Sequence, residues 1–191
     1  TVKGFKIVRK DGSGWRQAVR VDHSEVTIES NILKMEGTDI APTVMVIDRS
    51  GVAISNVDVM NNKVTGTTDG IMVTHHYGNG ISDIKVSDNT VIGSDHGVML
   101  KEHDGEGSTE NVEVRDNEFK NNKEAIHLTE AGVEYGTYTM GDFNPNQATV
   151  EENNFYNSNA QDIVNGDSSS RELGAADNWW GTDGVQTEGE V

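Results

Sequence analysis

Residues 57–64 read Val-Asp-Val-Met-Asn-Asn-Lys-Val, and residues 84–91 read Ile-Lys-Val-Ser-Asp-Asn-Thr-Val. Both stretches have an apolar residue, any residue, an apolar residue, two further residues, Asn, any residue and an apolar residue. The same pattern occurs six times in the chain. Its asparagines are Asn31, Asn62, Asn89, Asn117, Asn153 and Asn178, separated by steps of 31, 27, 28, 36 and 25 residues. Apolar residues at alternate positions indicate short β-strands and not helices.

A second short apolar strand begins eight residues after the asparagine in three of the repeats, at residues 70–73, 97–100 and 125–128. A repeat of this length fits one turn of a solenoid, whose neighbouring coils hydrogen-bond at a spacing of about 4.8 Å. We therefore predict an all-β fold, a parallel β-helix of about seven coils over residues 1–181. We expect it to continue from upstream coils and to be followed by a polar tail over residues 182–191.

The repeat asparagines predict a side-chain ladder. A side-chain amide carries both hydrogen-bond donors and acceptors, so stacked asparagines can bond to one another and to the backbone of a turn. Asparagine also tolerates the left-handed backbone of tight corners. Six such residues in register predict an Asn ladder along one corner of the coils.

The repeats, the opening residues 2–7 (VKGFKI) and the closing residues 177–181 (DNWWG) resemble those of right-handed parallel β-helix repeat proteins of the pectate-lyase-like superfamily. The resemblance is closest to the carbohydrate-binding and sugar-hydrolase type of secreted archaeal and bacterial proteins. It implies a right-handed single-stranded parallel β-helix that contacts polysaccharide. In the last coil we expect Trp180 to point inward and Trp179 outward, both capping the stack.

The composition limits the partners of the protein. It has 15 basic and 32 acidic residues, a net charge of −17, and no cysteine. Such a surface repels nucleic acid and anionic membranes, and no apolar run is long enough to enter a membrane. Because the acidic residues are spread along the chain, we expect a protein of a halophilic archaeon or of a halophile's virus. We predict an extracellular, cell-surface or virion-surface location.

One outward column of the second strands is unusually apolar. Met45, Met72 and Met99 follow one another at steps of 27 residues, and His127 continues the column. Such a column needs a cover, which could be a loop of the same chain, another copy or another surface protein, or a glycan. The long step after Asn117 places Tyr135 and Tyr138 in an insertion within residues 129–147, which could fold back over the methionines or stack on sugar rings.

A polar column precedes the second strands. Asp69, His96 and Glu124 each lie seven residues after a repeat asparagine, so stacking brings neighbours within about 5 Å. Two carboxylates at that separation can act as acid and nucleophile in glycoside cleavage. The alternative is a solvated acidic corner with no catalytic role.

Residues 67–71 (TTDGI) and 94–97 (SDHG) resemble parts of two polygalacturonase motifs, which would make Asp69 and Asp95 catalytic. The other motifs of that family, Gly-His-Gly and Arg-Ile-Lys, have no counterpart in the following coils. The carry-over therefore stops at these two residues.

The sequence fixes no metal site. His75 or His76 with His103 and Asp104 could bind a metal, and the acidic loop 104–106 could take calcium through oxygen ligands. Neither arrangement matches a known signature, so calcium is a candidate and no cofactor is predicted.

Three functions fit these observations. The first is a non-catalytic extracellular module that binds polysaccharide or another surface glycan. The second is a structural or adhesive subunit of a surface filament, cell wall or virus fibre. The third is a polysaccharide lyase or glycoside hydrolase that uses Asp69, Asp95, His96 and Glu124.

Overall fold

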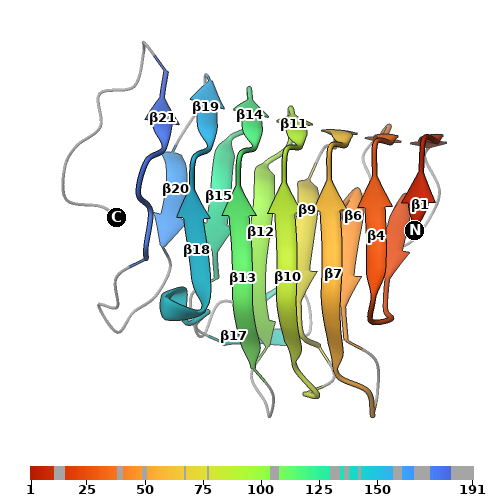
Figure 1. The fold of residues 1–191 in the computed structure, drawn as a ribbon, viewed down its shortest axis with the longest axis vertical. Helices are drawn as coiled ribbons and strands as arrows, with labels where there is room; N and C mark the ends of the chain where they lie inside the picture. The colour runs from red at the N-terminus through yellow and green to blue at the C-terminus, as the bar shows by residue number, and fades with distance from the viewer. Residues whose placement is uncertain are drawn as a thin grey trace.

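The structure, a computed structural model, describes residues 1–10, 16–37, 41–48, 51–66, 68–76, 78–103, 108–129, 134–135, 138–141, 143–156, 161–165 and 173–181. Its strands form three long parallel sheets around one core (Figure 1). The first sheet contains β1 (Val2–Lys3), β4 (Val26–Glu29), β7 (Ile54–Met60), β10 (Ile81–Ser87), β13 (Thr109–Arg115) and β18 (Ala148–Glu151). The second contains β2 (Lys6–Arg9), β5 (Ile32–Met35), β8 (Lys63–Thr65), β11 (Thr90–Ile92), β14 (Glu118–Lys120), β19 (Asn154–Tyr156) and β21 (Trp179–Trp180).

The third sheet closes each coil. It contains β3 (Val19–Val21), β6 (Val44–Ile47), β9 (Asp69–Thr74), β12 (His96–His103), β15 (Glu124–Leu128) and β20 (Gln161–Asn165). Six coils thus carry a strand in every sheet, and β21 begins a seventh. The predicted all-β parallel β-helix is confirmed, with slightly fewer complete coils than the predicted seven. In the described part of the chain the one helical element is the short 3₁₀ turn η1 (Pro145–Gln147), and no helix there is long and apolar enough to cross a membrane.

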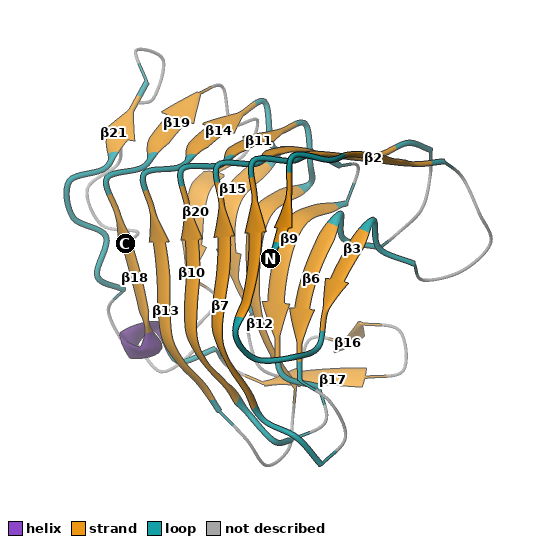
Figure 2. Ribbon diagram, turned by 45° about the vertical axis from the view of Figure 1, so that its right-hand side comes forward, coloured by secondary structure: helices purple, strands orange, loops and turns teal. Residues whose placement is uncertain are grey.

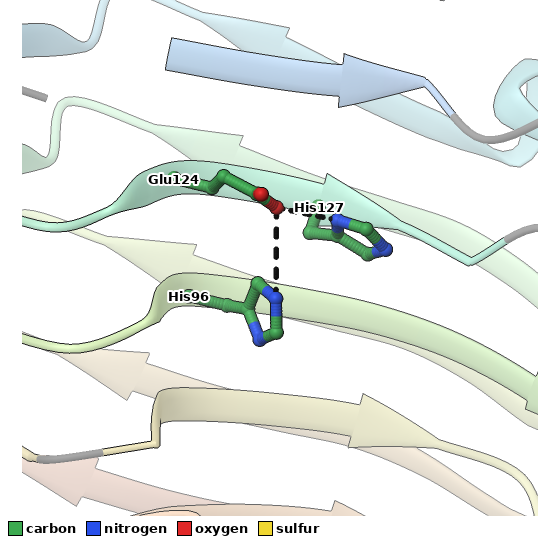
Figure 3. Close-up of side chains that lie close together, drawn as sticks. All are labelled: His96, Glu124 and His127. Carbon is green, nitrogen blue, oxygen red and sulfur yellow. Dashed lines mark hydrogen bonds and ion pairs between the residues drawn. The ribbon is translucent and has the colours of Figure 1, made fainter. Parts of the chain in front are cut away.

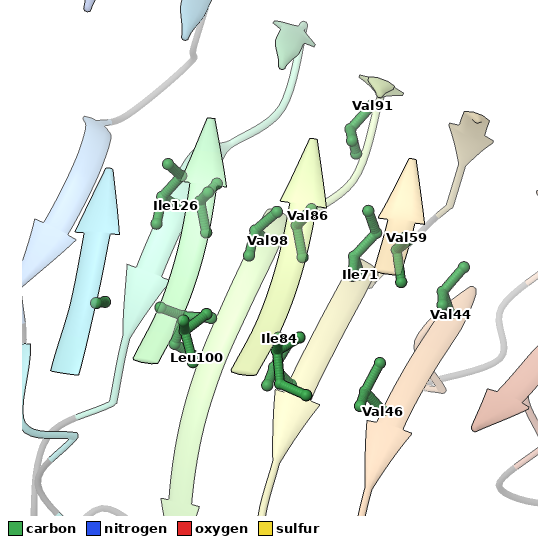
Figure 4. Close-up of a cluster of buried hydrophobic side chains, with 14 of the residues drawn as sticks. Val44, Val46, Val59, Ile71, Ile84, Val86, Val91, Val98, Leu100 and Ile126 are labelled. Atoms are coloured by element: carbon green, nitrogen blue, oxygen red, sulfur yellow. The ribbon is translucent and has the colours of Figure 1, made fainter. Parts of the chain in front are cut away.

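Apolar columns fill the interior. In the first sheet Ile84 pairs in register with Val57 and Val112, so like residues stack from coil to coil. Side chains of the first and third sheets meet in the space between those sheets (Figure 4). At one end Phe119, Phe155 and Trp180 form a stack, with ring centroids 5.4 and 4.7 Å apart. Trp180 therefore points inward as predicted, while Trp179 is 44% exposed.

The predicted Asn ladder runs along the corner between the first and second sheets. Asn62 shows its geometry: its backbone N–H and its Nδ2 both donate to Asn89 Oδ1, at 2.9 and 3.1 Å, and its Nδ2 also donates to the carbonyl of Ile28 at 2.8 Å. The other rungs repeat these contacts up to Asn178.

The left-handed backbone of this corner lies one residue earlier than predicted. The residues with positive φ just before the ladder positions are Ser30, Asn61, Asp88, Asp116, Glu152 and Asp177. The ladder asparagines themselves are not among the residues with positive φ. They are therefore required for the hydrogen bonds of their side chains and not for their backbone freedom.

The methionine column is covered by the chain itself. Met45, Met72 and Met99 are at most 4% exposed and form an outer cluster with Ile47. Of the covers that the sequence left open, burial by the same chain is the one that the structure shows, and these three methionines offer no exposed face to a glycan or to another copy.

An antiparallel hairpin from the predicted insertion lies against this sheet. β16 (Glu134–Tyr135) and β17 (Tyr138–Gly141) form the hairpin, and β17 pairs with the end of β12 (Figure 2). The insertion therefore folds back towards the third sheet. The side chains of Tyr135 and Tyr138 lie outside the described part of the structure.

Candidate functional site

The predicted polar column lies at the start of the third-sheet strands. Asp69, His96 and Glu124 are the first residues of β9, β12 and β15, and His96 is in register with the other two. Figure 3 shows His96 on one strand facing Glu124 and His127 on the next. The structure thus brings together three of the four residues predicted to be catalytic and adds His127. We call Asp69, His96, Glu124 and His127 the imidazole–carboxylate cluster.

His96 lies between the two carboxylates. Its Nδ1 is 2.7 Å from Asp69 Oδ1, and its Nε2 is 3.5 Å from Glu124 Oε2. The imidazole occupies the space in which an acid–nucleophile pair would hold a glycosidic bond. The described geometry therefore does not bring Asp69 and Glu124 together as such a pair, because the two carboxylates lie two coils apart with the His96 side chain between them.

Asp95 does not join the cluster. It is exposed at the turn before β12 and acts on His96 through its charge. The structure offers it no hydrogen-bonded role beside Asp69, as the resemblance to polygalacturonases would require.

His127 joins the cluster although it lies three residues after Glu124 on β15. Residues three apart on a regular strand face opposite sides. Here Ala125 and Ile126 are both buried, so Glu124 and His127 share the outer face. The Nδ1 of His127 is 2.7 Å from Glu124 Oε2, and the rings of His96 and His127 are 4.8 Å apart. His127 is also in register with Met99, as the column predicted.

The two histidines have opposite pKa shifts. Burial lowers the pKa of His96, but the hydrogen bond to Asp69 and the charges of Asp69, Glu124 and Asp95 together raise it above its ordinary value. Burial lowers the pKa of His127, and the hydrogen bond to Glu124 only partly offsets this. The protein therefore favours the cationic form of His96 and the neutral form of His127.

A buried lysine lies on the same strand as His96. Burial lowers the pKa of Lys101 to about 8, with the charge of Asp69 opposing this shift. Asp69 itself is fully buried, and its Oδ2 has no hydrogen-bond partner within the described structure.

The other residues predicted to bind a metal are only partly described by the structure. Asp48 accepts hydrogen bonds from the backbone N–H groups of His76 and Asn79, at 2.6 and 3.0 Å, which anchors the turn after β9. His75 is buried, and burial lowers its pKa. The side chain of His103 and the acidic loop 104–106, including Asp104, lie outside the described residues.

A second polar surface covers the outer face of the second sheet. Its strands alternate between inward apolar residues and outward residues that include four lysines: Lys6, Lys34, Lys63 and Lys120. At one end the rings of Tyr156 and Trp179 are 4.8 Å apart, and Lys120 Nζ lies 5.4 Å from the centre of the Tyr156 ring. We call these six residues the lysine–aromatic face. Five of the six lie one or three residues after a ladder asparagine, so the repeat contained a signal that could have found them.

Comparison with known proteins identifies the repeat architecture. A family model described as the right handed beta helix region matches residues 2–179. Neither the curated proteins nor the solved structures gave a match. The matched range spans all three sheets and both polar surfaces.

Proposed function

The chain belongs to the right-handed β-helix family, and on that basis we propose that it is a non-catalytic extracellular module that binds an acidic polysaccharide. The binding surface we propose is the lysine–aromatic face. The same proposal includes a pectate-lyase-like ancestry and a halophilic source, which the closing DNWWG segment and the even spread of acidic residues support.

The observation that carries this proposal is the gathering of four lysines and two aromatic rings on the outward positions of one sheet. Parallel strands place outward residues at steps of about 4.8 Å, comparable to the length of one sugar unit in a linear polymer. An aromatic ring offers an apolar surface on which the C–H face of a sugar can pack. Trp179 is 44% exposed and is available for such a contact.

Charge selects the class of polysaccharide. The protein has a net charge of −17, so most of its surface repels an acidic polymer. The outward strand positions of the second sheet carry four lysines and one glutamate, Glu118. Lys34 and Lys120 are paired with Glu36 and Glu118, at 2.8 and 2.7 Å.

Lys6 and Lys63 are exposed and have no ion-pair partner within the described residues. Acidic residues of the ladder corner, among them Asp88 and Asp116, border the face on one side. An acidic polymer is therefore expected to follow the lysines along the stack and to keep away from that corner.

The experiment is binding of polygalacturonate, with neutral dextran as the comparison polymer, measured by affinity electrophoresis. An exposed ion pair contributes about 0.2–1 kcal/mol, and reversing the charge adds a repulsion of about the same size, so Lys63→Glu should weaken polygalacturonate binding roughly twofold to thirtyfold. The matched control is Lys85→Glu, the same charge change on the first sheet. Equal effects of Lys63→Glu and Lys85→Glu, or no binding of polygalacturonate by the native protein, would contradict the proposal.

The two other functions lose their main support. Assembly through the methionine column required an exposed apolar face, and the chain covers that face itself. Cleavage by Asp69 and Glu124 required an open space between the carboxylates, and His96 fills it.

A further inference from the structure

The imidazole–carboxylate cluster lies on a different sheet from the lysine–aromatic face and is not explained by polysaccharide binding there. His96, Glu124 and His127 each offer one ligand atom, and these atoms all lie within 4.8 Å of one another. Their side chains are 15–24% exposed, so an ion can reach them from solvent. We propose that His96, Glu124 and His127 bind a divalent transition-metal ion of the zinc class.

The two distances from Glu124 to the histidines are close to those of a metal site with two nitrogen ligands and one oxygen ligand. Tetrahedral bonds of about 2.0–2.1 Å place neighbouring ligand atoms roughly 3.3–3.5 Å apart. His96 Nε2 and Glu124 Oε2 are already 3.5 Å apart (Figure 3). His127 Nδ1 and Glu124 Oε2, now 2.7 Å apart, need to separate by about 0.6 Å to reach that spacing. A small rotation of the His127 ring, which is 24% exposed, provides this movement.

Asp69 supports the site from behind. Metal-binding histidines usually donate their other ring nitrogen to a carboxylate, which fixes the tautomer and the ring direction. Asp69 Oδ1 lies 2.7 Å from His96 Nδ1, so it holds the proton there and leaves Nε2 directed towards Glu124. This carboxylate is fully buried and its second oxygen has no described partner. A cation at His96 would compensate the charge of Asp69 through the imidazole.

The ligand set also selects the ion. Calcium and magnesium prefer oxygen ligands, whereas imidazole nitrogen suits zinc, copper, nickel and cobalt. Three protein ligands leave a fourth position for water or for an oxygen of a bound molecule, as in open zinc sites. Calcium is therefore not the ion expected at this cluster.

The test is isothermal titration of the tag-free full chain with zinc chloride, followed by cobalt chloride and its visible absorption spectrum. We expect one zinc ion per chain, a tetrahedral cobalt spectrum and no calcium binding at this site. His127→Ala and Glu124→Gln should each weaken zinc binding at least tenfold. Asp69→Asn, which alters a supporting residue and not a ligand, should weaken it about ten- to a hundredfold.

His23→Ala is the matched control, because His23 is an exposed histidine that also contacts a carboxylate, that of Asp22. Thermal melting separates loss of metal from loss of fold: zinc should raise the melting temperature of the native chain and of His23→Ala, but not that of His127→Ala. Absence of stoichiometric zinc binding, or an equal loss in His23→Ala and His127→Ala, overturns the proposal. Either result leaves the polysaccharide measurement unaffected, because the two surfaces lie on different sheets.

Discussion

Replacing a central ladder asparagine tests the part of the fold on which every surface position depends. In Asn89→Ala the chain loses four hydrogen bonds of one side chain. Oδ1 accepts from the N–H and the Nδ2 of Asn62, and Nδ2 donates to Asn117 Oδ1 and to the carbonyl of Val59, at 2.8–3.1 Å. At about 1 kcal/mol each, with a further cost for buried groups left without partners, the free energy of unfolding should fall by about 4–5 kcal/mol.

Asn178 at the end of the ladder gives a graded comparison. Its side chain makes three such bonds and is only partly buried, so Asn178→Ala should cost about 1–2 kcal/mol. Asn154→Ala, an outward residue of β19, serves as the control for loss of an asparagine. The assay is urea unfolding at fixed salt, in which the slope of the free energy of unfolding against urea concentration should be the same for all variants. If Asn89→Ala costs less than about 1 kcal/mol, or no more than Asn154→Ala, then the ladder does not stabilise the coils as reasoned.

Four further outcomes are expected. Gly97→Ala places a Cβ 2.5 Å from the carbonyl oxygen of Ala125 and should lower stability by about 1–3 kcal/mol in urea unfolding, whereas Gly174→Ala, with open space around it, should have little effect. Because the pKa of His96 is raised in the folded state, its contribution to stability is present below its unfolded pKa of about 6.5 and is lost as pH rises through the folded value. In His96→Gln this loss of stability with rising pH should disappear, and a pH profile of stability equal to that of the native chain would contradict the raised pKa. His127, with a lowered pKa, acts in the opposite direction, so stability should decrease as pH falls below about 6.5, and this decrease should be weaker in His127→Gln. If the acidic surface is an adaptation to high salt, the melting temperature should fall as salt is withdrawn from molar to millimolar concentration, and a melting temperature independent of salt would remove that idea.

The fold could be predicted because one period controls it. A repeated asparagine and two alternating apolar positions fix the inward face of every coil, so the registers of Ile84 with Val57 and Val112 follow from sequence alone. The left-handed residue was placed one position too late, because the corner backbone and the ladder side chain are separate requirements. Asn122 is a buried asparagine outside the ladder, and its Oδ1 accepts a hydrogen bond from Ser94 N–H at 3.0 Å. It was missed at the level of sequence because it does not stand at the repeated asparagine position.

The site was predicted only in part for a different reason. The step of seven residues brought Asp69, His96 and Glu124 into one column, which the structure bears out as a stacking arrangement. A spacing along the stack does not show which side chain fills the space between two others. The contact of His127 with Glu124, three residues earlier on the same strand, and the burial of Met45, Met72 and Met99 are not encoded in the period.

A solenoid of this kind separates the positions that hold the coils together from those that can bind. The inward apolar columns and the Asn ladder hold neighbouring coils together, so a substitution at an outward position should have a smaller effect on the stability of the fold. The residues of the lysine–aromatic face come from six of the seven strands of the second sheet, so a ligand that contacts them all has to extend along the stack, as a polymer does. The imidazole–carboxylate cluster occurs at adjacent coils and suits a single ion, because its ligands come from two strands backed by a third.

Variants that affect one surface should therefore leave the other unchanged. Lys63→Glu should retain the zinc affinity of the native chain, and His127→Ala should retain its affinity for polygalacturonate. Measuring both affinities in both variants tests this independence, and a loss of both in either variant would show that the two surfaces act as one site.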